Sequence, residues 1–151
     1  MNQNNYRSQI EAYILRNALP VDKFSHQPRL YQLACHLAAC EKLAYDDDIL
    51  HAAVWLHDLG VFIGHRPEDP EALSQWDHIA YVERTIPSLL SSWSFPATKI
   101  DAVIAVIKQH MPQSIPESAE AILLHDADVL EQMGAIGLVR AFANSLHQKK
   151  M

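Results

Sequence analysis

The chain has 151 residues and a mass of 17.1 kDa, the size of one domain that buries about two-thirds of its unfolded surface. Hydrophobic residues make up 49% and charged residues 20%, which excludes a disordered or low-complexity chain. The formal net charge of -6 provides no overall basic surface, so a duplex nucleic acid is a disfavoured partner and a small ligand is favoured. We therefore expect a single domain over residues 1–151.

The sequence also predicts where in the cell the protein is found. No apolar run approaches the roughly 18 residues of a membrane span, and the N-terminal residues lack the apolar stretch of a signal peptide. Cys35 and Cys40 lie five positions apart in one predicted helix and point to different faces, so they are expected to be reduced thiols. These features predict a cytoplasmic protein with no membrane association.

The first half of the chain predicts helices joined by short turns, because glycine is scarce and the prolines fall between apolar segments. An amphipathic helix is expected over residues 6–19, ended by Pro20, and a second apolar stripe runs over residues 30–43. The acidic triplet at residues 46–48 is expected to cap a third helix over residues 49–59. Carboxylates there bond free backbone N–H groups and favour the positive end of the helix dipole.

The second half continues the all-α pattern. The expected elements are, in order, a loop over 62–70, a helix over 70–93, a helix over 96–110 and an apolar segment over 117–147. Pro87 predicts a break or kink in the first of these helices. Gly134 and Gly137 predict that the last segment forms two helices or one bent helix.

The first candidate functional residues lie at the end of the third predicted helix, where His57 and Asp58 follow an almost wholly apolar stretch. A carboxylate in apolar surroundings is costly unless it is paired, hydrogen-bonded or metal-bound. A lone His-Asp doublet is more often structural than a metal site, so further ligands are needed. His26 precedes the second apolar stripe and Asp128 lies on the last predicted helix. Neutral imidazoles and carboxylates from separate helices suit a divalent transition metal inside a helical bundle.

The ordered set His26, His57, Asp58 and Asp128, with the segment Asp-Ala-Asp-Val-Leu-Glu running into Gly-Ala-Ile-Gly, resembles the HD superfamily of metal-dependent phosphohydrolases. The resemblance covers about residues 20–142 and implies a single-domain, all-α helical bundle. It also implies one or two divalent transition metal ions, with Mn, Ni, Co, Fe and Zn as the candidates. A bound metal lowers the pKa of its water and polarises a phosphoryl oxygen, so cleavage of a small phosphorylated substrate such as a nucleotide is the expected reaction.

The last ligand requires a choice between two carboxylates. Asp126 and Asp128 are two residues apart and cannot face the same direction on a helix, and both faces are apolar. The family pattern, Ala-Asp followed by an apolar residue and Leu, matches Asp128 to the metal ligand. Asp126 is then a supporting or structural carboxylate.

Two further histidines, His78 and His110, lie between the doublet and Asp128 in the order seen in the binuclear branches of the superfamily. That resemblance implies a second ion, with Asp58 bridging the two. The alternative is structural: His78 caps or packs against a helix, and His110 ends its helix, where an imidazolium favours the dipole.

Other polar residues are weaker candidates. Arg29 and Arg140 are expected to join His57 and Asp58 in catalysis by contacting a phosphate, or else to be solvated or ion-paired. His65, Arg66 and Lys108 border the predicted mouth of the site, His125 is expected to support the ligands, and His36, His51 and His147 are expected not to bind metal.

Two other functions compete with phosphohydrolysis. Some binuclear relatives with the same ligand order are di-iron oxygenases, and other HD relatives are non-catalytic regulatory or binding modules. This chain retains every candidate ligand, which argues against a non-catalytic module. The oligomeric state and the individual substrate do not follow from the sequence.

Overall fold

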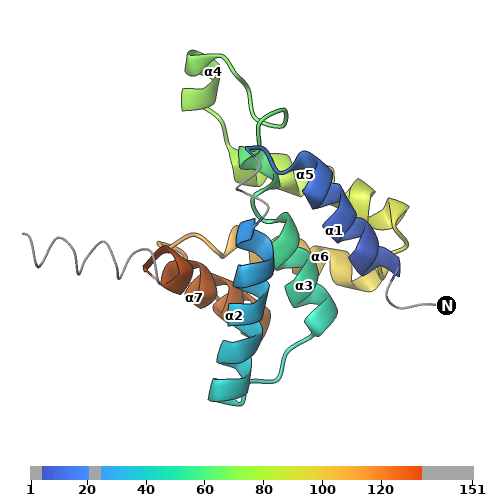
Figure 1. Cartoon of the computed structure of the whole chain (residues 1–151), viewed down its shortest axis with the longest axis vertical. Helices are drawn as coiled ribbons and strands as arrows, with labels where there is room; N and C mark the ends of the chain where they lie inside the picture. Colours follow the sequence, from blue (N-terminus) through green and yellow to red (C-terminus); the bar gives the residue numbers. More distant parts are fainter. Residues whose placement is uncertain (1–4, 21–24, 134–151) are drawn as a thin grey trace, which may run out of the picture.

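The computed structural model describes residues 5–20 and 25–133, and these residues form helices without a β-strand (Figure 1). The elements are α1 (Asn5–Asn17), α2 (His26–Glu41), α3 (Asp47–Leu56), the 3-10 turn η2 (Leu59–Val61), α4 (Pro70–Ser74), α5 (His78–Ser92), α6 (Ala97–Lys108) and α7 (Ala119–Met133). The all-α prediction is confirmed. The predictions for Gly134, Gly137, Arg140 and His147 fall outside the described residues.

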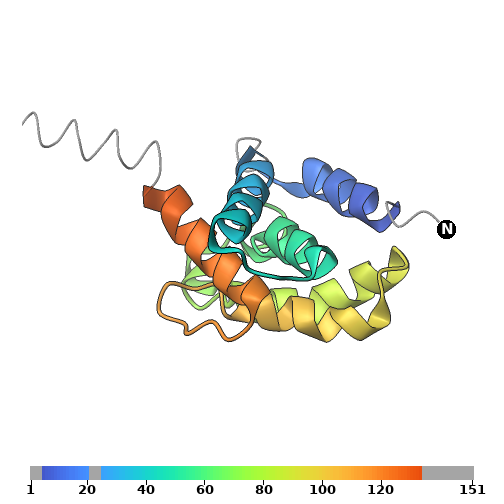
Figure 2. The ribbon, with the colours of Figure 1, turned by 90° about the horizontal axis from the view of Figure 1, so that it is seen from below.

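Helix α3 forms the centre of the bundle. It packs against α1, α2, α6 and α7, and in Figure 2 it lies between α1 and α2 on one side and α5 and α6 on the other. Every residue from Leu50 to Leu56 is buried. A helix that is apolar on all sides is stable only when it is surrounded by other helices. Its C-terminal end, which carries the His57-Asp58 doublet, is therefore held deep in the fold.

The acidic cap of α3 is confirmed. The Asp46 carboxylate accepts hydrogen bonds from the backbone N–H groups of Asp48 and Ile49. The predicted end at residue 59 is wrong, because Asp58 leaves the helical conformation, with φ -94° and ψ 5°, and leads into η2. The doublet thus lies on the bend after α3 and not within a helix.

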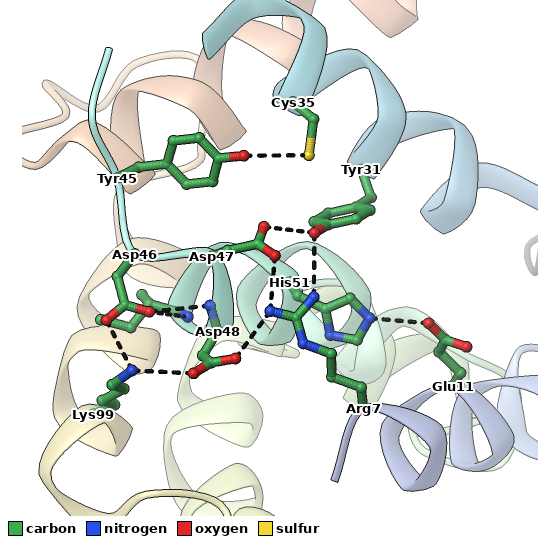
Figure 3. A network of polar contacts seen from close by, with 11 residues as sticks. Arg7, Glu11, Tyr31, Cys35, Tyr45, Asp46, Asp47, Asp48, His51 and Lys99 are labelled. Atoms are coloured by element: carbon green, nitrogen blue, oxygen red, sulfur yellow. Dashed lines mark hydrogen bonds and ion pairs between the residues drawn. The ribbon is translucent and has the colours of Figure 1, made fainter. Parts of the chain in front are cut away.

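A polar network fixes the N-terminal end of α3 (Figure 3). Arg7 on α1 donates to Asp47 Oδ2 at 2.8 Å and to Asp48 Oδ1 at 2.9 Å, and Lys99 on α6 donates to Asp48 Oδ2 at 3.1 Å. Burial would raise the pKa of Asp48, but the hydrogen bonds from Arg7 and Lys99 help to outweigh it and hold that pKa at about 2. The ionised carboxylates therefore join α1 and α6 to α3.

The predicted helix over residues 70–93 is two helices, and its break is not at Pro87. The chain breaks at residues 75–77, where the Asp77 side chain accepts from the N–H of Ala80 and begins α5. Pro87 lies inside α5. The Trp76 indole donates to the carbonyl oxygen of Gly60 at 2.7 Å and fixes the break against η2. A side-chain cap and a tertiary hydrogen bond thus decide where α5 starts.

Two composition-based expectations can be compared with the structure. Cys35 and Cys40 both lie on α2 and form no disulfide with each other. Among the described helices, none has the length and apolarity required to cross a bilayer.

Candidate metal centre

Side chains from four helices and the bends that follow them converge at one place in the bundle. The contributing residues are His26 at the start of α2, His57 and Asp58 after α3, His110 after α6 and Asp128 on α7. Their ligand atoms form two groups, His26 with His57 and Asp58, and His57 with His110 and Asp128. Within each group the atoms lie within 4.8 Å of one another, and His57 belongs to both.

The spacing of the ligand atoms matches a divalent metal. His26 Nε2 lies 3.7 Å from Asp58 Oδ2 and 3.6 Å from Asp128 Oδ1, and His57 Nε2 lies 3.4 Å from Asp58 Oδ1. Ligand atoms about 2.1 Å from an ion at tetrahedral angles are separated by about 3.4 Å. Imidazole nitrogens with carboxylate oxygens are a donor set for Zn, Fe, Mn, Co or Ni.

The imidazoles of His57 and His110 are held with Nε2 free. His57 Nδ1 lies 2.6 Å from the carbonyl oxygen of Val54, and His110 Nδ1 lies 2.5 Å from that of Ile107. A carbonyl oxygen only accepts, so each Nδ1 carries the proton and donates it. Each Nε2 then retains the lone pair that a metal requires.

Burial and charge shift the pKa values of three residues of the centre. Burial, with a contribution from the nearby His57, lowers the pKa of His110. Burial would raise the pKa of Asp128, but its contact with His26 and the neighbouring imidazoles outweigh it, so that pKa is lowered. The nearby Asp128 carboxylate raises the pKa of His26 against the effect of burial. Neutral His110 and ionised Asp128 are the ligand forms, whereas a protonated His26 must release its proton to bind a metal.

The two candidate carboxylates of α7, Asp126 and Asp128, differ in burial and in their partners. Asp128 is 7% exposed and belongs to the second group. Asp126 has a side chain that is 56% exposed, and its Oδ1 lies 3.0 Å from His125 Nδ1. The structure therefore brings Asp128, and not Asp126, to the centre.

His78 lies near the centre but outside both groups. It is the first residue of α5, and its ring centroid is 6.5 Å from that of His110. Gly60 in η2 sets how closely this helix approaches, because a Cβ built there would lie 2.6 Å from the His78 carbonyl oxygen. The position of His78 is therefore fixed by packing against η2.

The weaker candidates have other partners. Arg29 donates to Glu131 Oε1 at 2.9 Å, so of the two roles expected for this arginine the structure has the ion pair. The remaining contacts are His65 with Tyr81 and Asn17, Lys108 with Glu83, His51 with Glu11 and His36 with Cys40. None of these side chains belongs to a metal-binding group among the described residues.

Glu131 was missed by reasoning from the sequence. Its Oε1 lies 3.8 Å from His26 Nδ1. The available signal was its spacing of three residues from Asp128, which places both carboxylates on one face of α7.

The comparisons agree with this geometry. The sequence model of the HD domain matches residues 24–133. The chain belongs to the HD domain family. This places it in a superfamily of metal-dependent phosphohydrolases, and the match spans α2 to α7, including every residue of the two groups that could hold a metal.

A solved structure supports the HD fold. It is the crystal structure of a protein from Lactobacillus plantarum determined as a structural genomics target, with a TM-score of 0.66 and 25% identity. The alignment covers 99% of this chain and 66% of that protein, so this HD chain spans just under two-thirds of its length. A search of curated proteins finds no match.

The number of bound ions can be tested at His57 and His110. The two groups share His57, whose single free nitrogen binds one ion only, so a second ion requires the nitrogen of His110. We expect the purified chain to bind about two metal equivalents, one held by His57 and the other by His110, and His110→Ala to bind about one. His78→Ala should lower the metal content less, because His78 lies outside both groups. Elemental analysis of the three proteins, with circular dichroism to verify folding, makes the measurement. One equivalent in the parent chain, unchanged by His110→Ala, would contradict a second ion.

Proposed function

We propose that this HD domain is a phosphohydrolase that cleaves a phosphate ester or nucleotide with a metal-activated water. The supporting observation is the convergence of His26, His57, Asp58 and Asp128, whose facing ligand atoms lie 3.4 to 3.7 Å apart. A divalent metal held by these residues would supply a water of lowered pKa and would polarise a phosphoryl oxygen.

The chain's own residues define how a substrate approaches. His26 and Asp58 have side chains that are each 21% exposed, whereas the His57 side chain is only 1% exposed. The open side of the centre is therefore formed by His26 and Asp58. The two carboxylate oxygens of Asp58 face different histidines, with Oδ1 facing His57 and Oδ2 facing His26. Asp58 therefore links the buried side of the centre to its open side.

A cationic side chain lies beside that open side. Arg29 lies one helical turn after His26, and its side chain is 55% exposed. Glu131 accepts from Nε of this guanidinium, and the donors on its two terminal nitrogens would be the ones to bind phosphate oxygens. This supports a small phosphorylated ligand as the partner.

A di-iron oxygenase is the second candidate, favoured by the second group of His57, His110 and Asp128. That function requires two iron ions and consumption of O₂. Elemental analysis and an oxygen electrode distinguish it from phosphohydrolysis.

The proposed reaction is tested by the dependence of hydrolysis on metal. The chain loaded with Mn, Co, Ni, Fe or Zn should release phosphate from generic phosphate esters or nucleotides, and EDTA should remove the activity because the nucleophile requires the ion. Readdition of the metal should restore it. Activity that persists after chelation, with no metal found by elemental analysis, would contradict the proposal.

A further inference from the structure

The imidazoles of the centre differ in what faces their Nδ1 atoms. His57 and His110 each follow a helix, so each Nδ1 reaches a carbonyl oxygen three residues earlier in the chain. His26 is the first residue of α2 and follows Ser25, before which residues 21–24 are not described. Among the described residues, the oxygen that faces its Nδ1 comes from another element.

Helix α7 provides that oxygen. Glu131 Oε1 faces His26 Nδ1 at 3.8 Å, an ion-pair distance beyond that of a hydrogen bond, and Asp128 Oδ1 lies 3.6 Å from His26 Nε2. Glu131 follows Asp128 by one helical turn, so one face of α7 presents a carboxylate to each ring nitrogen of His26. The Glu131 side chain is only 22% exposed, which limits competition from water.

Arg29 holds Glu131 in this position. Its Nε donates to Glu131 Oε1 at 2.9 Å, the same oxygen that faces His26, and its Nη1 donates to Ser25 Oγ at 3.2 Å. Arg29 follows His26 by one turn on α2. Two residues of α2 therefore meet two residues of α7, and the guanidinium restrains the carboxylate through a charge-assisted hydrogen bond.

We propose that Glu131 is a positioning residue that keeps His26 protonated at Nδ1 with Nε2 directed at the metal, and that Arg29 acts by holding Glu131. The inference rests on the proposed metal centre. A carboxylate that accepts from the outer nitrogen of a metal-binding histidine fixes its tautomer and ring orientation and raises its basicity. For His57 and His110 the backbone performs this task, so Glu131 is the partner that a substitution can remove.

The test is the affinity of the chelator-stripped full chain for Mn²⁺, measured without substrate. Glu131→Ala should weaken Mn²⁺ binding about 10- to 100-fold. Glu131→Gln should recover part of this loss, because its amide oxygen can accept from Nδ1 but carries no charge. Asp126→Asn removes the same charge from an exposed position of α7 and should leave the affinity unchanged.

Thermal unfolding separates a loss of Mn²⁺ affinity from a loss of fold. If Glu131→Ala does not fold, Glu131→Gln carries the test, and its affinity should lie measurably below that of the parent.

The outcomes distinguish the two proposals. A parent chain that binds no Mn²⁺ would overturn the proposed function and this inference with it. A parent chain that binds Mn²⁺ as tightly as its folded Glu131 variants would overturn the inference alone. Arg29→Ala added to Glu131→Ala should cause no further loss of Mn²⁺ affinity, and an additional loss would overturn the role assigned to Arg29.

Discussion

Asp58→Asn should abolish metal-dependent hydrolysis and leave the bundle folded. Asp58 is the residue whose two oxygens face two different imidazoles, His57 at 3.4 Å and His26 at 3.7 Å. Loss of a residue that only supports a metal ligand costs about 10- to 100-fold in affinity or activity, so loss of a ligand should cost at least about 100-fold. Metal affinity by titration and phosphate release by a colorimetric assay should fall together.

The fold should survive because the Asp58 side chain is partly exposed and contributes no hydrogen bond to a helix cap. Melting curves in EDTA should therefore nearly coincide for the parent chain and Asp58→Asn. Asp101→Asn removes the same charge from an exposed position of α6 and should retain full activity. Normal metal binding and hydrolysis by Asp58→Asn would remove Asp58 from the centre and contradict the proposed mechanism.

Local patterns predict most of the helices but not where one of them breaks. The apolar run before His57 and the acidic cap at Asp46 indicate α3 without any tertiary information, since both depend on neighbours within one helix. The break before α5 combines a local cap by Asp77 with the Trp76 hydrogen bond to Gly60, sixteen residues earlier. The cap is a local pattern but the contact with Gly60 is not, and Pro87 was the more visible but incorrect signal.

The candidate site also has residues that the sequence predicts and residues that depend on how the helices pack. His26, His57, Asp58 and Asp128 could be selected because their residue types and order match an HD pattern, and the structure brings them together. The different situations of His110 and His78 could not be predicted, because they depend on how α5 and α6 pack. Glu131 was missed because its partner His26 lies on another helix, 105 positions earlier in the chain.

Gly60→Ala should destabilise the chain and weaken metal binding from outside the ligand set. Gly60 lies two residues after Asp58, where η2 meets the first residue of α5. A Cβ there would lie 2.6 Å from the His78 carbonyl oxygen and 2.9 Å from its Cα, distances that require backbone movement. Overpacking of this kind costs about 2 kcal/mol, which corresponds to a fall in melting temperature of about 4–8 °C for a chain of this size.

The displacement should also reach the metal centre, because the same short turn carries Asp58 at one end and accepts the Trp76 hydrogen bond in its middle. Gly64→Ala provides the matched control. Gly64 has φ +93° and no atom within 4 Å of an added Cβ, so its cost of about 1–2 kcal/mol arises from the backbone conformation alone. Both variants should melt earlier, but only Gly60→Ala should bind Mn²⁺ more weakly at a temperature where both are folded. Equal Mn²⁺ affinity in the two variants would show that the contact between η2 and α5 does not position Asp58.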